Sequence, residues 1–133
     1  MDHHGTDFGV NCFRVWEVAA IDLPAFATRL VSAGNDVYNV TNAQITGGSG
    51  TAQVVAAWSR VASALESLFQ ESVDNTYAAA DALSAIATAY SNSDADAKKE
   101  FDARRTDEIT KHQNDPNVIV YDDPYYRPQI MGD

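Results

Sequence analysis

The chain has 133 residues, a length that fits one domain of ordinary size and is too short for two. Its formal net charge of −10 argues against nucleic acid or an anionic membrane as a partner, because both repel an acidic surface. Cys12 is the only cysteine, so no internal disulfide forms, and we interpret it as a small buried hydrophobe. The fold must therefore be stabilised by packing.

The N-terminal segment, residues 1–21, is predicted to be extended, with the apolar residues of FGVNCFRVWEV lying along a neighbouring helix. Asp2 and Asp7 stand where a secretory signal has lysines, and no sustained apolar stretch follows, so we expect no cleaved signal peptide. Met1-Asp2-His3 offers an amine, two amide nitrogens and an imidazole, which suit Cu(II) or Ni(II) if Met1 is the true N-terminus. We otherwise predict no metal site.

A short helix is predicted over residues about 22–45. Asp22 fits the N-cap and Pro24 fits the first turn, where a missing N–H is tolerated. Apolar residues then recur at helical spacing, among them Phe26, Leu30 and Val37. The next stretch, TGGSG, breaks the helix with Gly47, Gly48 and Gly50. Such a short, flexible segment permits an antiparallel turn between two helices.

A long helix is predicted over residues about 51–92, because apolar residues recur every three or four positions with no proline or glycine between them. The predicted seam on this helix consists of Trp58, Val61, Leu65, Phe69, Val73 and Leu83. The two helices together predict an all-α fold, an antiparallel helical hairpin. Because two helices of unequal length bury only one seam, we expect a second copy or another protein to cover the rest.

The chain becomes charged beyond the long helix. Residues 94–113 can continue as an exposed helix, which Asp115-Pro116 ends. The last stretch, NVIVYDDPYYRPQIMGD, holds three tyrosines and two prolines, and is either a partner-binding peptide or a disordered terminus. We therefore divide the chain into an N-terminal segment (1–21), a hairpin domain (22–101) and a charged, partly disordered tail (102–133).

The sequence offers no constellation of catalytic residues. His3, His4 and His112 lie outside the predicted helical core, where no cleft would desolvate them. GGSG lacks the lysine and the preceding strand of a phosphate-binding loop. We predict that the protein is not an enzyme and uses no cofactor.

Three segments carry a resemblance to a known family: VWEVAAIDLPAFATRL, GGSGTAQVVAAWSRVASALESLF and LSAIATAYSNSDADAKKEF. They resemble the EspC-like family of ESX (type VII) secretion-associated proteins, within the broader Trp-x-Gly-type secreted helical hairpins, over residues 13–101. The resemblance implies an export signal, Tyr-x-x-x-Asp, just past the second helix. Here that signal falls on Tyr90 and Asp94, and its looser version adds the apolar residues Ala97 and Phe101. The turn departs from the family, because the nearest tryptophan gives Trp58-Ser59-Arg60 inside the helix.

A second pair, Tyr77 and Asp81, also fits Tyr-x-x-x-Asp. Tyr77 lies in the middle of the predicted helix, whereas Tyr90 lies where the apolar pattern stops. We therefore expect only the Tyr90 pair to be presented for recognition. The alternative interpretation of Tyr90 is an aromatic residue that closes the seam at the helix end.

The leading hypothesis is a non-enzymatic protein that is cytoplasmic before export and then secreted or held at the cell surface. The expected partners are a second copy or another protein, together with a secretion motor ATPase or a dedicated chaperone, with no nucleic acid and no membrane span. The alternative is an intracellular helical adaptor or toxin-partner protein that binds through its helical seam and its tyrosine-rich tail.

Overall fold

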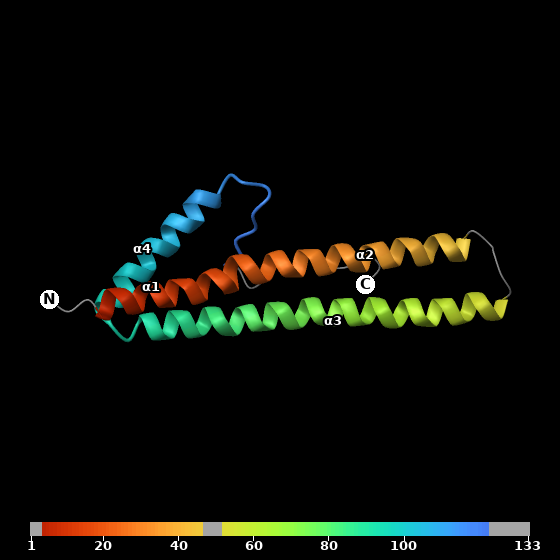
Figure 1. The fold of residues 1–133 in the computed structure, drawn as a ribbon, viewed down its shortest axis with the longest axis horizontal. Coiled ribbons are helices and arrows are strands. Elements are labelled where there is room, and N and C mark those ends of the chain that lie inside the picture. The colour runs from red at the N-terminus through yellow and green to blue at the C-terminus, as the bar shows by residue number, and fades with distance from the viewer. Residues whose placement is uncertain (1–3, 47–51, 123–133) are drawn as a thin grey trace. The chain divides into compact units, whose positions relative to one another are not determined.

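The computed structural model describes residues 4–46 and 52–122, without the side chains of 41–46. It is all-helical in these ranges, which contain no strand, so the predicted all-α class is confirmed. The elements are α1 (His4–Glu17), the π-helix η1 (Val18–Asp22), α2 (Leu23–Thr46), α3 (Ala52–Ser91) and α4 (Ala95–His112), drawn in Figure 1. The prediction of a long uninterrupted helix is confirmed by α3.

The chain consists of two compact units. The first unit comprises Met1–Ala25 and Thr76–Tyr126, and thus holds α1, η1, the C-terminal part of α3 and α4. Phe26–Asn75 belongs to the second unit, which holds most of α2 and the N-terminal part of α3. Each unit has buried residues of its own.

The prediction of an extended N-terminal segment is wrong for residues 4–17, which form α1. The physical reason is a buried stripe at helical spacing, because Gly9, Cys12, Phe13 and Trp16 all lie on one face of this helix. Phe13 and Trp16 stack with their ring centroids 5.8 Å apart. A helix is favoured because it satisfies the backbone of this segment while it buries that face.

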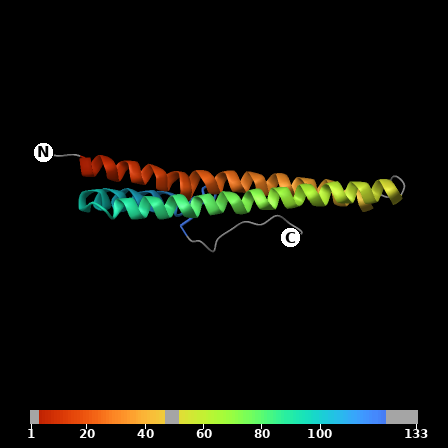
Figure 2. The ribbon, with the colours of Figure 1, turned by 90° about the horizontal axis from the view of Figure 1, so that it is seen from below.

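The predicted helix at about 22–45 corresponds to α2, but the expected N-cap role of Asp22 is wrong, because the helix continues from α1 through η1 into α2 (Figure 2). Pro24 lacks the N–H that would bond the Ala20 carbonyl in a regular α-helix, and its ring would clash there. The π-turn accommodates the proline, with the Leu23 N–H donating to the Val18 carbonyl. The Ala20 carbonyl instead accepts a hydrogen bond of 2.7 Å from the Tyr121 N–H.

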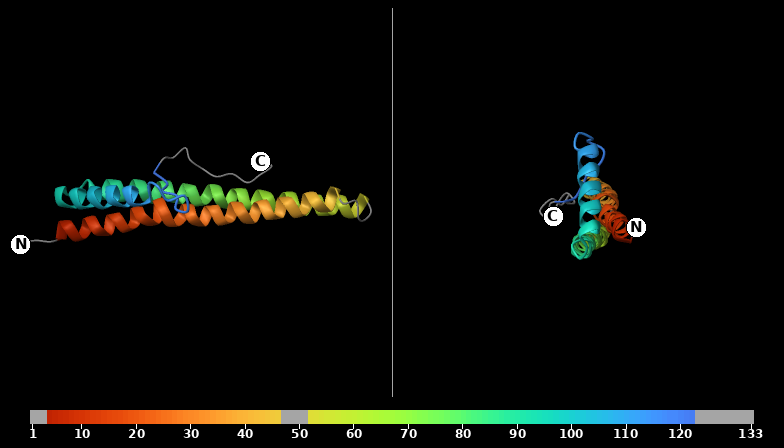
Figure 3. Two further views of the ribbon diagram at one scale, coloured as in Figure 1. Left: turned by 90° about the horizontal axis from the view of Figure 1, so that it is seen from above. Right: turned by 90° about the vertical axis from the view of Figure 1, so that its left-hand side faces the viewer.

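The core of the first unit lies where α1 packs against α4. A buried cluster fills it, composed of Cys12, Phe13, Trp16, Ala20, Ala87 and Phe101. Gly9 allows the two helices to approach closely, since a Cβ there would lie 2.6 Å from the Ala97 carbonyl oxygen. The chain after α4 turns back onto this core, as Figure 3 shows, and Val120 packs against it.

In the second unit, the buried residues of both helices are Gly, Ala and Val, whereas several larger apolar side chains are exposed. Ala27, Val31 and Gly34 are buried on α2, and Ala62 and Val73 are buried on α3. Among the predicted seam residues, Val73 is buried, and Leu30, Val37, Phe69 and (in the first unit) Leu83 are half-buried. As a seam within the chain, the prediction is wrong for Phe26, Trp58, Val61 and Leu65, which are exposed. Their role as a seam for a partner stays a prediction.

Candidate functional site

Tyr90 lies one residue before the end of α3, and its side chain is 60% exposed. Its ring meets Phe8 of α1 edge to face, with centroids 6.5 Å apart and an interplanar angle of 75°. Phe8 is itself exposed. The first unit therefore presents a pair of aromatic rings to solvent, a geometry that aromatic pairs prefer.

The turn after Tyr90 is fixed by short-range hydrogen bonds. The Ser93 N–H and hydroxyl both donate to the Tyr90 carbonyl, at 3.1 and 2.6 Å. The buried Ser91 donates its hydroxyl to the Thr88 carbonyl at 2.9 Å. The Thr88 carbonyl also accepts from the Asn92 N–H at 3.1 Å, whereas the two bonds from Ser93 satisfy the Tyr90 carbonyl, which the end of α3 would otherwise leave open.

Asp94 is the N-cap of α4. Its backbone is extended, with φ −144° and ψ 129°, and its Oδ1 accepts from the N–H groups of Asp96 and Ala97 at 2.9 and 3.0 Å. Gly5 of α1 lies against this carboxylate, since a Cβ on Gly5 would be 2.8 Å from Oδ1. One oxygen of Asp94 is thus engaged by the start of α4, as expected for an aspartate cap.

The other two residues of the predicted signal lie inside the first unit. Ala97 and Phe101 are 0% and 1% exposed and face the core between α1 and α4. Neither side chain is therefore available at the surface for direct recognition, and their part in an export signal stays a prediction. They support the position of α4 instead.

The second Tyr-x-x-x-Asp pair is covered. Tyr77 is 0% exposed, and its ring meets the Tyr121 ring edge to face at 4.8 Å between centroids. The Tyr121 hydroxyl donates to Asp81 Oδ1 at 2.7 Å. Both members of this pair are therefore occupied within the first unit, in contrast to the exposed ring of Tyr90.

Tyr121 anchors the chain that follows α4, a role that the sequence reasoning missed. Besides its ring and hydroxyl contacts, its N–H donates to the Ala20 carbonyl, and the neighbouring Asp122 accepts from Arg105 Nη2 at 2.7 Å. The available signal was the apolar run Val118–Tyr121 after the helix-breaking Pro116. This part of the tail is docked, whereas Tyr125 and Tyr126 lie outside the described residues.

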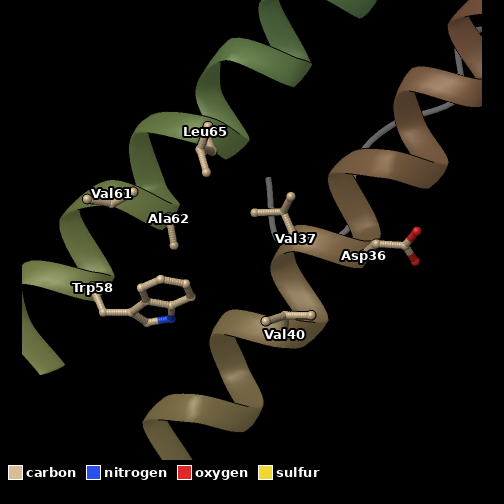
Figure 4. Close-up of a pocket in the computed structure, with 7 residues that line it drawn as sticks. All are labelled: Asp36, Val37, Val40, Trp58, Val61, Ala62 and Leu65. Carbon is tan, nitrogen blue, oxygen red and sulfur yellow. The ribbon is translucent and has the colours of Figure 1, made fainter.

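The second unit contains a cavity of about 240 Å³ that opens to solvent (Figure 4). Its lining comes from both helices and consists of Asp36, Val37, Val40, Trp58, Val61, Ala62 and Leu65. Figure 4 shows Asp36 pointing away from the space between the helices. The walls are therefore almost entirely apolar, which suits hydrophobic side chains of a partner.

Other sequence predictions concern metals, membranes and the turn. Across residues 4–46 and 52–122, three or more His, Cys, Asp or Glu residues never gather as a metal site would require. Within the same part of the chain, no helix combines the length and the apolar character that crossing a bilayer demands. Gly47, Gly48, Gly50 and the Met1-Asp2-His3 sequence lie outside the described residues.

Burial raises the pKa of the Cys12 thiol, which lowers its reactivity at neutral pH.

Comparisons with known proteins gave no match, whether to a protein family, to a curated protein or to a solved structure. The resemblance to the EspC-like family therefore stays a prediction from sequence motifs.

Proposed function

We propose that this chain is a non-enzymatic substrate or accessory protein of an ESX-type (type VII) secretion system. It is exported through the end of α3 that carries Tyr90, and it acts by helix-mediated self-association or pairing. The observation that carries the proposal is the contrast between its two Tyr-x-x-x-Asp pairs. Tyr90 is 60% exposed, whereas Tyr77 is 0% exposed and covered by Tyr121.

The proposed fold is an antiparallel hairpin of α2 and α3. Residues 26–75 form one compact unit, and both helices line the same cavity. Only residues 47–51 connect the two helices, a length typical of an antiparallel helix pair. In this arrangement, the end of α3 and the start of α4 provide the export signal within the first unit.

Recognition by a secretion motor ATPase or a dedicated chaperone takes place at the exposed aromatic pair. An aromatic ring that enters an apolar pocket is a frequent centre of binding energy, and Tyr90 and Phe8 together offer two. Asp94 contributes as a positioning residue, because its carboxylate caps α4 and thereby fixes the turn after Tyr90. Cytoplasmic synthesis precedes export to the medium or the cell surface.

The test compares the culture supernatant with the cell pellet in an actinobacterium that has an active ESX system. Tyr90→Ala is expected to remain in the pellet, whereas the wild type and Ile86→Ala are found in the supernatant. Ile86 is the matched control, because it lies one turn earlier on α3 and is also exposed, at 46%. Export of Tyr90→Ala at the wild-type level contradicts the proposal.

Retention of both the wild type and Tyr90→Ala favours the alternative predicted from the sequence, an intracellular helical adaptor. That alternative relies on the tyrosine-rich tail. Tyr121, the first tyrosine of this tail, is only 5% exposed and is held by contacts within the first unit. Tyr121 is therefore part of the packed core of the first unit and is not available to bind a partner, which weakens the adaptor interpretation.

A further inference from the structure

The cavity of the second unit is lined by large apolar side chains that stay exposed. Trp58 and Leu65 lie on its α3 side, 41% and 40% exposed, and Val40 lies on its α2 side, 54% exposed (Figure 4). The unit buries the smaller residues Ala27 and Ala62 instead. Small residues let two helices approach closely, which leaves their bulkier neighbours at the rim of the contact. An exposed apolar hollow of this kind is typical of a binding surface.

The size and the walls of the cavity favour an aliphatic side chain as the occupant. A cavity of about 150 Å³ inside a protein accommodates one benzene ring. The cavity of about 240 Å³ therefore has room for a large aliphatic side chain and for part of the backbone that carries it. Because an aliphatic group makes no hydrogen bonds in water, it leaves none unsatisfied between apolar walls. A short peptide with one such residue fits this site.

A peptide of this chemistry follows Asp122 in the same chain. Residues 123–133, DPYYRPQIMGD, lie outside the described residues and contain Ile130. Pro128 restricts the backbone two residues before Ile130, and the β-branched isoleucine favours an extended conformation. A peptide that is already restricted to extended conformations loses less entropy when it binds. The sequence of this segment therefore suits it to dock in the cavity as an extended chain.

The anchor of this segment places the cavity within its reach. Tyr121 is held against Tyr77 of α3, with 4.8 Å between the ring centroids. Leu65 precedes Tyr77 by twelve residues on the same helix, a separation of about 18 Å along its axis. Ile130 follows Tyr121 by nine residues, which span about 28 Å in an extended proline-rich conformation. Ile130 can therefore reach the level of Leu65, and bending of α3 only shortens the distance to be spanned.

The charges of the cavity rim and of the segment are complementary. Among the residues that line the cavity, Asp36 alone is charged, and it points away from the space between the helices (Figure 4). Arg127 is the only basic residue of the segment 123–133. It precedes Ile130 by three residues, a distance of about 9 Å in an extended chain, so it reaches the rim when Ile130 enters the cavity. An exposed ion pair there orients the segment more than it strengthens binding.

We propose that the segment after Asp122 docks on its own chain, with the side chain of Ile130 in the apolar cavity between α2 and α3. The short tether gives the segment an effective concentration in the millimolar range, so a Kd of about 0.1 mM keeps it mostly docked. A helical protein that pairs with the second unit through this surface must displace Ile130 first. The segment thereby limits pairing to partners that bind more tightly than it does. The docking is a property of the single chain and does not depend on the proposed export.

The test measures how strongly acrylamide quenches the fluorescence of Trp58 in the full purified chain. Trp16→Phe leaves Trp58 as the only tryptophan and is the parent of every variant. Ile130→Glu is expected to weaken docking about ten- to a hundredfold, because the burial of an aliphatic side chain is lost, and thus to raise the quenching constant. Gln129→Glu is the matched control, since it adds the same charge at a neighbouring position that faces the opposite side of an extended chain. It is expected to be quenched like the parent.

Variants of the cavity wall test the other side of the contact. Leu65→Glu is expected to be quenched as strongly as Ile130→Glu, and the two substitutions together add nothing further. Leu68→Glu is expected to be quenched like the parent, because Leu68 is an exposed residue of α3 that does not line the cavity. Far-ultraviolet circular dichroism must show equal helix content for all variants. Trp16 is 0% exposed, so the same comparison in the wild-type background checks the Trp16→Phe substitution.

Equal quenching in the parent and in Ile130→Glu overturns the proposal. Equal quenching in Gln129→Glu and Ile130→Glu also overturns it, because the effect then comes from added charge. Quenching that decreases as the protein concentration rises assigns the cavity to a second copy and contradicts docking within one chain. Tyr90→Ala is expected to be quenched like the parent, so a failed export signal and a failed docking segment give different results.

Discussion

The hydrogen bond between Tyr121 and Asp81 offers a sharp test of how the segment after α4 is held. Tyr121→Phe removes only the hydroxyl, which donates to a carboxylate at 2.7 Å, and keeps the ring against Tyr77. A hydrogen bond to a charged group contributes about 1.5–3 kcal/mol. Asp81 is half-buried, so water partly replaces the lost donor, and we expect a loss of about 1.5 kcal/mol in the free energy of unfolding.

The assay is urea denaturation followed by circular dichroism, with a double-mutant cycle of Tyr121→Phe and Asp81→Ala. Because the two side chains interact directly, the cycle is expected to give a coupling energy of about 1 kcal/mol or more. Tyr90→Phe is the control, since its ring is 60% exposed, and it is expected to leave stability unchanged. Additive losses in the double mutant, within about 0.5 kcal/mol, refute the reasoning.

Three further predictions concern the first unit. Gly9→Ala places a methyl group 2.6 Å from the Ala97 carbonyl oxygen, and we expect a loss of about 1–3 kcal/mol in denaturant unfolding. Asp94→Ala removes the cap of α4 and is expected to lower the free energy of unfolding by about 1 kcal/mol, whereas Asp94→Ser keeps a capping oxygen and retains most of that stability. Export of the serine variant but not of the alanine variant would show that export depends on the cap rather than on the negative charge. Burial raises the pKa of the Cys12 thiol in the folded state, so this thiol loses its proton at lower pH in the unfolded state. The free energy of unfolding of the wild type should therefore fall relative to that of Cys12→Ala as the pH rises above about 8.5. Urea titrations at several pH values measure this difference.

The long helix was the most predictable element, because its determinants are local. The predicted bounds of about 51–92 compare with Ala52–Ser91 in the structure. No proline or glycine interrupts this stretch, and alanine, the best helix former, is frequent in it. The exposure of Tyr90 could also be predicted, since the apolar pattern stops at that residue.

The junction between α1 and α2 could not be predicted from local signals. Pro24 is equally compatible with the first turn of a new helix and with a π-turn inside a continuing one. The choice depends on a distant residue, because the Tyr121 N–H bonds the Ala20 carbonyl that the proline leaves without its usual donor. Sequence periodicity carries no information about such a contact.

In the second unit, the predicted seam matches the structure at Val73, which is buried, but its N-terminal part on α3 is exposed. The sequence reasoning placed the largest apolar residues inside, at Trp58, Val61 and Leu65. The structure buries Ala62 instead, one position later than Val61. Hydrophobic periodicity identifies the apolar side of a helix, but it does not show which residues on that side contact the neighbouring helix and which remain exposed next to this contact.

The role of Asp94 in the candidate site could not be decided from the sequence either. The resemblance assigns Asp94 to the export signal, but an aspartate at the start of a helical stretch is equally typical of a helix N-cap. The structure shows the cap, so Asp94 stabilises the start of α4 independently of any recognition of Tyr90. Loss of export in an alanine variant at this position alone would therefore not identify a recognition contact.

The proposed self-association and the proposed export can be tested separately, because the residues assigned to them belong to different units. Leu65 lies in the second unit and Tyr90 in the first, and neither contributes to the buried cluster between α1 and α4. A Leu65→Glu chain that is monomeric and still exported shows that the signal is read from a single copy. A Leu65→Glu chain that is monomeric and retained in the cell shows that the proposed export requires the associated form.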